Sequence, residues 1–344
     1  MLESQVQANH PLKSFNSFGF AVLADYLVTI KDETHLREAL DYARAKELSL
    51  VVLGEGSNVV FRQNINALVL KMAITGIQII EENESSVLVQ VGAGENWHQF
   101  ILWCLQNNYY GLENLSLIPG AVGAAPIQNI GAYGVEQNKC FDCLQAVNRL
   151  TGEIVVFNNS NCEFGYRDSV FKGKFLDQFI ITQVSYRLNK QADTQTAYGA
   201  IKDELAAMNA DPNDPKAVSR AVCNIRRSKL PSPKVIGNAG SFFKNPVVDA
   251  RTFKQLKSQY QALVAYPQDH GMVKLAAGWM IEFCGWKGFR EGDVGVHADQ
   301  ALVLVNYGDG LGTELIELAV RIQRSVHDKF GIHLEIEPRI YPAL

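Results

Sequence analysis

A Gly-rich segment without a charged residue, Ile118 to Gly134 (IPGAVGAAPIQNIGAYG), constrains this chain more than any other stretch. Its four glycines stand among small and amide side chains. Glycine reaches positive φ and lets another group approach the backbone, and successive N–H groups in such turns can form one anion-binding concavity. A second segment of this kind, Gly54 to Phe61 (GEGSNVVF), follows the apolar run Leu50–Leu53. Two such turns predict a long ligand that carries phosphate.

Either loop alone could be an ordinary tight turn, because glycine also serves wherever a loop needs an unusual dihedral angle. A third stretch, GAGENW after the apolar run Val87–Val91, is similar to a dinucleotide-binding fingerprint of strand, G-x-G and helix. Trp97 stands where the third glycine of that fingerprint would allow close packing of helix on strand. The sequence therefore predicts that the ligand is held by another fold.

The composition excludes several classes of partner. With 344 residues the chain is long enough for two or three compact units. Its net charge of −4 leaves no basic surface for a nucleic acid. We find neither a signal peptide nor an apolar run near the ~18 residues that span a bilayer, so we expect no membrane partner and a cytoplasmic protein. The six cysteines fit a reducing compartment.

The Cys140-x-x-Cys143 pair has no second pair at zinc spacing and no thioredoxin-like context, so we interpret both as small buried side chains. His297 also lacks a partner at ligand spacing, and we predict no metal site.

The hydrophobic pattern predicts alternating strands and helices in the first half of the chain. Asp32 is expected to cap a helix whose buried stripe is Leu36, Leu40 and Ala43. The further expected elements are strands at 50–53, 87–91, 154–157, 179–188, 301–305 and 332–341, a helix from Trp97 through Leu105, a surface excursion over Asn189–Asp214, a helix from Pro215, an irregular loop over Ser228–Pro246, and helical stripes through Leu275, Trp279 and Phe283 and through Leu315, Leu318, Ile322 and Val326.

Six motifs in order carry a resemblance to a known family. They are GEGSN, the Gly-rich segment, FGYRDSVFK (164–172), SKLPSPKVIGNAGSFFKNP (228–246), HADQALVLVN (297–306) and a terminal Glu-Pro-Arg. In this order they resemble the UDP-N-acetylenolpyruvoylglucosamine reductase (MurB) family, over nearly the whole chain. The excursion with Tyr198 is similar to the tyrosine-bearing segment of its type I branch.

The resemblance implies an α+β protein with a two-lobed FAD-binding fold of the vanillyl-alcohol-oxidase/PCMH type and a C-terminal α+β substrate-binding domain. The expected boundaries are 1–75 for lobe 1, completed by 338–344, then 76–225 for lobe 2, with the type I insertion near 189–214, and 226–337 for the substrate domain. It further implies that NADPH reduces FAD, that enolpyruvyl-UDP-GlcNAc takes a hydride from flavin N5 to give UDP-N-acetylmuramate for peptidoglycan, and that the enzyme is a monomer.

The resemblance assigns FAD contacts to both glycine loops, and no His or Cys in them can attach the flavin covalently, so we expect non-covalent FAD. Ala124 and Ala125 replace serines found in some relatives. The residues expected to bind the cofactor are Gly54, Glu55, Gly56, Ser57, Asn58, Pro119, Gly120, Gly123, Ala124, Ala125, Gln128, Asn129, Gly131, Tyr133 and Gly134.

The resemblance also implies a catalytic trio. Arg167 matches an arginine that stabilises charge on the substrate carboxylate, Ser241 matches the proton donor, and Glu337 matches a glutamate that stabilises the enolic intermediate. Glu335 has the same parity on a strand, so the glutamate could be either of the two. Arg167 could instead form a local ion pair with Asp168. The expected substrate contacts are Tyr166, Tyr198, Lys229, Asn245 and Gln300.

Two other functions remain open from sequence. An oxidase on the same fold would reduce oxygen, and a non-catalytic nucleotide-binding protein would keep the loops alone. The motifs around Ser241 and Glu337 argue against the first, and the presence of all three catalytic residues argues against the second.

Overall fold

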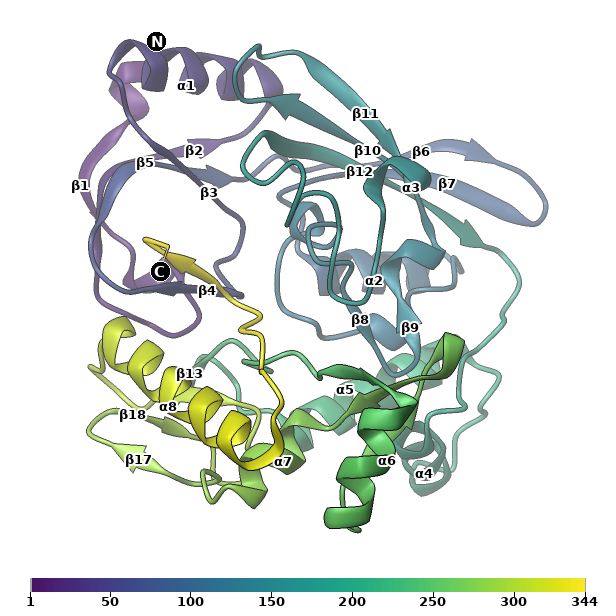
Figure 1. Cartoon of the computed structure of the whole chain (residues 1–344). Coiled ribbons are helices and arrows are strands. Elements are labelled where there is room, and N and C mark those ends of the chain that lie inside the picture. Colours follow the sequence, from purple (N-terminus) through teal and green to yellow (C-terminus); the bar gives the residue numbers. More distant parts are fainter. Residues whose placement is uncertain (1, 344) are drawn as a thin grey trace. The chain divides into compact units, whose positions relative to one another are not determined.

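The computed structural model describes residues 2–343 and divides them into two compact units (Figure 1). Unit 1 comprises residues 2–10, 24–55 and 66–228, and unit 2 comprises residues 11–23, 56–65 and 229–343. The chain therefore passes between the units repeatedly before residue 66. The division into three domains at 75 and 225 stays a prediction.

Unit 1 begins with a four-stranded sheet in the order β1-β2-β5-β3, covered by helix α1 (Glu33–Ala45). Asp32 caps α1 as predicted, because its carboxylate accepts a hydrogen bond of 2.7 Å from the His35 N–H. The predicted stripe of Leu36, Leu40 and Ala43 is buried against β2 and β5. The strands are β1 (Gln7–Pro11), β2 (Leu23–Ile30), β3 (Leu50–Leu53) and β5 (Ile65–Met72).

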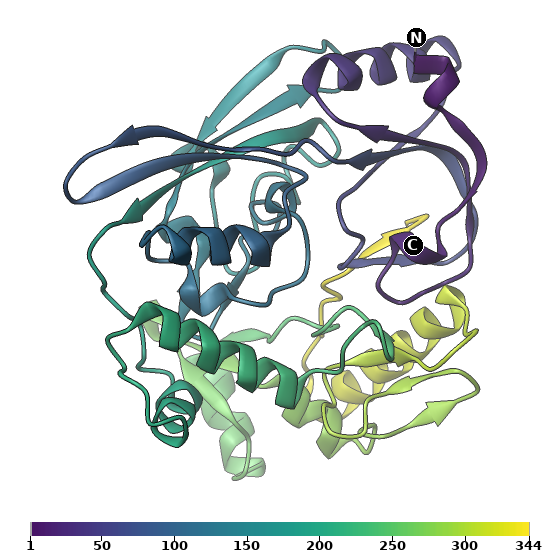
Figure 2. The same ribbon diagram turned by 180° about the vertical axis from the view of Figure 1, so that it is seen from behind.

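A five-stranded antiparallel sheet, ordered β11-β10-β12-β7-β6, forms the larger core of unit 1. Helix α2 (Trp97–Gln106) lies against one face, as Figure 2 shows from behind, and buries Trp97, Phe100 and Ile101 against β7 and β12. Trp97 is therefore a core residue. The strands are β6 (Ile77–Glu82), β7 (Ser86–Gly92), β10 (Phe141–Asn148), β11 (Ile154–Asn158) and β12 (Phe179–Asn189), and the short helix α3 covers Asn159–Cys162.

Several elements of unit 1 were not predicted from the sequence, among them the strands β1 and β6. Strand β10 carries Cys143 and pairs with both β11 and β12. The excursion 189–214 contains helix α4 (Gly199–Ala207), which packs Ile201 and Leu205 on the predicted helix α5 (Pro215–Lys229). All six cysteines are free, and burial raises the pKa of the Cys140 thiol to about 12.

Unit 2 consists of small sheets and three helices around one core. Its sheets have the orders β13-β19-β18-β17 and β14-β16-β15, and β20 pairs with β4 in parallel. The bounds are β4 (Val59–Phe61), β13 (Gly237–Asn238), β14 (Val247–Asp249), α6 (Ala250–Gln259), β15 (Ala265–Pro267), β16 (Met272–Leu275), α7 (Ala277–Phe283), β17 (Arg290–Glu291), β18 (Val294–Val296), β19 (Leu304–Asn306), α8 (Gly312–Phe330) and β20 (Arg339–Tyr341).

Some expectations for unit 2 were wrong. Leu275 ends β16 instead of joining a helical stripe, and the exposed Phe283 stacks with Trp279 and packs edge-on to Tyr260. The buried face of α7 is Ala277, Met280 and Ile281. The strand expected at 301–305 is the shorter β19. Of the strand expected at 332–341, only the last three residues form a strand, β20 (Arg339–Tyr341). The stripe on α8 is confirmed, and the helix ends at Gly331, which has φ 68°.

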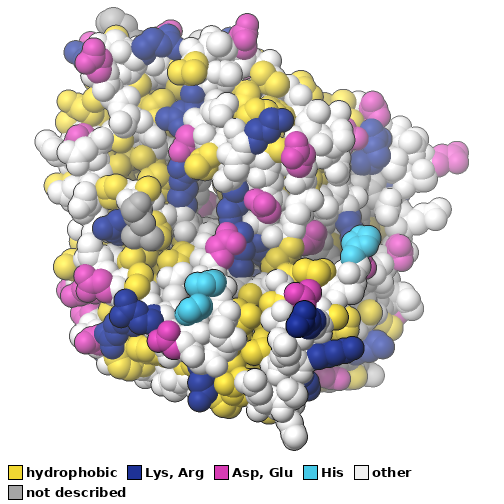
Figure 3. Space-filling view, viewed as in Figure 1, with side chains coloured by type: hydrophobic (Ala, Val, Ile, Leu, Met, Phe, Trp, Pro, Cys, Tyr) yellow, Lys and Arg dark blue, Asp and Glu magenta, His cyan; other side chains and the backbone are white. Residues whose placement is uncertain are grey.

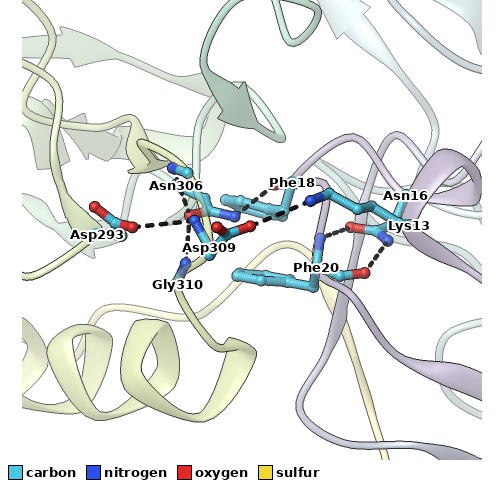
Figure 4. Close-up of polar contacts among 9 residues, drawn as sticks. Lys13, Asn16, Phe18, Phe20, Asp293, Asn306, Asp309 and Gly310 are labelled. Carbon is cyan, nitrogen blue, oxygen red and sulfur yellow. Dashed lines mark hydrogen bonds and ion pairs between the residues drawn. The ribbon is translucent and has the colours of Figure 1, made fainter.

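Within unit 2, two buried asparagines hold the early segment 11–23 in place (Figure 4). The Asn16 amide donates to the Leu12 and Phe20 carbonyls. Asn306 donates to the Phe18 carbonyl at 2.9 Å, and its oxygen accepts from the N–H groups of Gly308 and Gly310. Phe18 and Phe20 thereby lie fixed in the core of unit 2.

On the face drawn in Figure 3, basic and acidic side chains are interspersed, in line with the small net charge. Within residues 2–343, none of the helices combines the length and the apolar character that a membrane span requires.

We expect Asn306→Ala to lower the free energy of unfolding by about 1–3 kcal/mol, because it leaves the Phe18 carbonyl and two loop N–H groups without their buried partner. Denaturant unfolding followed by circular dichroism measures this change. Asn159→Ala removes an exposed amide and should cost less than about 0.5 kcal/mol. Equal losses in the two variants would contradict the role of Asn306.

Candidate functional site

The two glycine loops meet in unit 1 through Glu55. One carboxylate oxygen of Glu55 accepts a 3.1 Å hydrogen bond from the Gly120 N–H, and the other accepts a 2.7 Å bond from the Asn96 amide. A Cβ at Gly54 would lie 3.4 Å from the Cβ of Ala121. The structure thus brings together two segments that the sequence placed in one site.

Part of the glycine content serves packing within the chain. A Cβ at Gly123 would lie 2.5 Å from the Cβ of Ala93, and Gly120 has φ 129°. The N–H groups of Val122 and Gly123 donate to the Glu95 and Ala93 carbonyls. These amides hold the loop on the turn after β7, so they are engaged within the protein.

The remaining cofactor candidates differ in exposure. Asn129 is fully buried, and its amide donates to Glu136 and to the Gly165 carbonyl, which shapes the loop. Pro119, Glu55, Ala124 and Gly134 are exposed, Gly54, Gly123, Gln128 and Tyr133 are half-buried, and Gly120, Ala125 and Gly131 are buried.

The second half of the first loop, Gly56–Asn58, belongs to unit 2. Gly56 has φ 65°, and its carbonyl accepts from the Ser17 N–H at 3.0 Å. The Ser57 carbonyl accepts from the Ser17 hydroxyl, and the Asn58 carbonyl accepts from the Arg339 N–H at 3.0 Å. The loop is therefore fixed by an early segment and by the last strand.

Arg167 lies against the Gly-rich segment in unit 1. Its guanidinium donates to the Gly131 carbonyl and lies over the Tyr166 ring, 5.4 Å from the centroid. Its own φ is 56°, a conformation that non-glycine residues rarely adopt. The structure thus holds Arg167 in a costly backbone geometry beside the loop.

Sequence reasoning missed Arg226, a half-buried cation close to Arg167. Its Nε donates to the Leu117 carbonyl at 3.1 Å, and its guanidinium also bonds the Tyr133 hydroxyl. Burial lowers the pKa of Arg226, Tyr133 opposes this shift, and the neighbouring Arg167 adds to it. Two guanidinium groups at one loop favour an anionic ligand. The Arg226-Arg227 pair at the end of an amphipathic helix was the available signal.

Lys71 was missed as well. This half-buried lysine interrupts the apolar strand β5 and donates to the Gly54 carbonyl. Burial lowers its pKa, and the Glu55 carboxylate partly restores it. The first glycine loop therefore carries its own cation.

Tyr198 reaches the same region of unit 1. Its ring packs edge-on to the Tyr133 ring with centroids 5.4 Å apart, and 44% of the residue is exposed. Arg167 contacts Gly131 at the end of the Gly-rich segment, and Tyr198 contacts Tyr133 in the same part of it.

Ser241 and Glu337 lie on neighbouring segments of unit 2. Phe243 and Ile336 form an antiparallel bridge, and the Glu337 N–H donates to the Phe242 carbonyl at 2.9 Å. Ser241 is exposed while Phe242 and Phe243 are buried, so the two rings anchor the serine from behind. The same final segment reaches Asn58 through Arg339, which joins both residues to the first loop.

The structure separates the two candidate glutamates. Glu335 is exposed and forms an ion pair with Lys244, whereas Glu337 is half-buried. The two candidates therefore differ in exposure.

The other substrate candidates lie in unit 2. The Asn245 side-chain oxygen accepts from the Ala277 N–H at the start of α7, the half-buried Gln300 turns the chain before β19, and the exposed Lys229 ends α5.

Comparison with known proteins identifies the family. The family model described as "UDP-N-acetylenolpyruvoylglucosamine reductase, C-terminal domain" matches residues 231–341, and the "FAD binding domain" model matches residues 24–158. A UDP-N-acetylenolpyruvoylglucosamine reductase of Pseudomonas fluorescens is 49% identical over 98% of this chain and 99% of its own length. The chain belongs to the UDP-N-acetylenolpyruvoylglucosamine reductase family. A relative of the same name from Amoebophilus asiaticus is 46% identical over 97% of the chain and 99% of its own length.

A solved structure supports the fold. The UDP-N-acetylenolpyruvylglucosamine reductase of Thermus caldophilus matches with a TM-score of 0.68 at 22% identity, covering 98% of both chains. The predicted α+β class, with an FAD-binding fold followed by a C-terminal domain, is confirmed, and FAD is the cofactor of this family fold.

We expect the stability of the site to fall in acid because of His98. The Leu117 N–H, just before the Gly-rich segment, donates to His98 Nδ1 at 3.0 Å, so the native contact needs the neutral imidazole. Burial first, and then Arg227 and Arg226, lower the pKa of His98 below its usual 6.5. The unfolded chain therefore binds the proton more readily, and stability is lost as the pH falls below about 6.5. Thermal unfolding from pH 8 to 5 measures this.

The matched variant is His98→Gln, whose side-chain oxygen can accept the Leu117 N–H without titrating. The variant should lose less melting temperature on acidification than the wild type. Identical pH profiles would exclude His98 as the cause.

Proposed function

We propose that this protein reduces enolpyruvyl-UDP-N-acetylglucosamine to UDP-N-acetylmuramate, a peptidoglycan precursor, with NADPH as the reductant and non-covalently bound FAD as the carrier. The observation that carries the proposal is the backbone connection in unit 2. It joins Ser241, through Phe242 and Glu337, to the Gly56–Asn58 loop.

The residues present fit FAD. The two loops are joined through Glu55, and the cations Lys71, Arg167 and Arg226 lie at or beside them, where an anionic dinucleotide needs them. Because several amides of the second loop are engaged within the chain, we assign the diphosphate to the Gly54–Glu55 part of the first loop and to Lys71. When bound, FAD supplies the hydride chemistry that no side chain of this protein can perform.

Arg167 orients and stabilises the substrate carboxylate. Negative charge grows on this group when hydride adds to the conjugated double bond, and a guanidinium held in a fixed position stabilises that charge without reorganising. The bond to the Gly131 carbonyl and the contact with Tyr166 restrict the guanidinium in the manner that this role requires.

Ser241 donates the proton to the carbon beside the one that receives the hydride, and Glu337 stabilises the enolic form of the substrate. A hydroxyl is a weak acid, so the serine needs a strongly basic carbon and nearby positive charge. Lys244, three residues away, is a candidate for that charge. We further propose that Tyr166, Tyr198, Lys229, Asn245 and Gln300 bind the UDP-sugar, and that the enzyme acts as a cytoplasmic monomer.

The test of this function is a reconstituted assay with the purified full chain. The protein should be yellow, denaturation should release FAD, and NADPH oxidation should depend on enolpyruvyl-UDP-N-acetylglucosamine. Rapid oxygen consumption without that substrate would indicate an oxidase instead. Failure to retain or take up flavin would refute the proposal.

We expect Ser241→Ala to slow turnover by about 10²–10⁴-fold while NADPH still reduces the flavin at the wild-type rate, because only proton transfer to the substrate is lost. Stopped-flow absorbance separates the two half-reactions. Loss confined to flavin reduction would contradict the role of Ser241.

The two glutamates provide a matched pair. Glu337→Gln should lower kcat by about 10²-fold or more, whereas Glu335→Gln removes an exposed carboxylate that pairs with Lys244 and should change kcat less than about threefold. The reverse order would move the assignment to Glu335.

A further inference from the structure

One buried side chain joins the Gly-rich segment to the excursion that carries Tyr198. Asn114 lies in a short 3-10 helix (Glu113–Leu115) and is 1% exposed. Its amide nitrogen donates to the Tyr133 carbonyl at 3.1 Å and to the Gln195 carbonyl at 2.8 Å. A primary amide has two N–H donors, and here each has its own carbonyl.

The stretch that Asn114 reaches starts at Lys190, which is anchored by a 2.9 Å ion pair with Glu82 and by its N–H bond to the Ser85 carbonyl. Residues 190–198 contain no helix or strand, and α4 begins at Gly199. Helix α4 itself is anchored, because Ile201 and Leu205 pack on Val218 and Val222 of α5. Ahead of it, the Thr194 hydroxyl donates to the Pro212 carbonyl, which stays within the excursion. Asn114 therefore connects the middle of this stretch, at Gln195, to Tyr133 of the Gly-rich segment.

Tyr133 links Asn114 to Tyr198. Asn114 holds the backbone of Tyr133, whose φ is 50°, and the ring of Tyr133 packs against the ring of Tyr198. Asn114 therefore sets both the position of the ring that Tyr198 touches and the path of the chain three residues before Tyr198.

We propose that Asn114 is a positioning residue for the substrate, which acts by holding Tyr198 in place against Tyr133. This inference rests on the proposed function, in which Tyr198 contacts the UDP-sugar. It places the main effect of Asn114 on substrate binding, and a smaller one on the flavin, because Tyr133 is also among the cofactor candidates.

The kinetic test compares Asn114→Ala with wild type in the full-length holoenzyme. With FAD in excess, we expect the KM for enolpyruvyl-UDP-N-acetylglucosamine to rise about tenfold, while kcat and the rate of NADPH-driven flavin reduction each change less than about threefold. Asn114→Asp, which has nearly the same shape but no N–H donors, should behave like Asn114→Ala. In a Tyr198→Ala background, Asn114→Ala should raise KM less than about twofold further, because the two residues act through one contact.

A structural readout separates this inference from the proposed function. Cleavage before Asp193 by an aspartate-specific endoprotease, within the freed stretch, should become faster in Asn114→Ala, and this measurement needs no substrate. If the wild type failed to turn over the nucleotide, the proposed function would fail. Unchanged cleavage in Asn114→Ala would by itself overturn the positioning role of Asn114.

Asn306→Ala serves as the matched control, since it also removes a buried amide bonded to backbone groups, but in unit 2. It should lower the melting temperature at least as much as Asn114→Ala while changing KM less than about twofold. A similar rise in KM in both variants, or independent effects of Asn114 and Tyr198, would overturn the proposal.

Discussion

The position of Gly56 constrains the whole of unit 2. A Cβ at this residue would lie 1.9 Å from the Phe15 carbonyl oxygen, so only glycine lets the loop pass this close to the early segment. That approach allows the Ser17 N–H to bond Gly56, and the Asn238 N–H in turn bonds the Ser17 carbonyl. Segments that are distant in sequence are thereby fixed by backbone groups, and the segments that carry Ser241 and Glu337 are held in the same way.

Unit 1 achieves its site in a different way, by holding unfavourable backbone conformations with buried polar groups. Leu117, Asn129, Tyr133 and Arg167 all have positive φ. Each such residue costs of order 1–3 kcal/mol, and such residues persist where the surroundings determine them. His98, Arg226 and Asn114 supply those surroundings through bonds to Leu117 and Tyr133. The strained residues and the cations they position form one cooperative network.

The sequence predicted elements well where a local signal was strong. The Asp32 cap and the buried stripe of α1 rest on side chains only a few residues apart. The sequence did not predict helix α4, because the helix has only two buried apolar residues, Ile201 and Leu205. The predicted helical stripe through Trp279 and Phe283 was wrong, because those rings pack in a partly exposed aromatic cluster. The motifs identified the candidate trio, but the roles of Asn114, Lys71 and Arg226 depend on contacts with residues far away in sequence. No local pattern specifies such contacts.

The early crossings of the chain between the two units affect its synthesis. Phe18, Phe20 and Val60 belong to the same core as Leu315 and Ile322 on α8, so their partners leave the ribosome some 300 residues later. At ~5–20 residues per second, these aromatic side chains wait on the order of tens of seconds for burial. Such a delay exposes nascent apolar surface to aggregation or chaperones. It also means that a fragment beginning at residue 229 lacks part of its own interior, so the C-terminal unit cannot be excised as one contiguous piece.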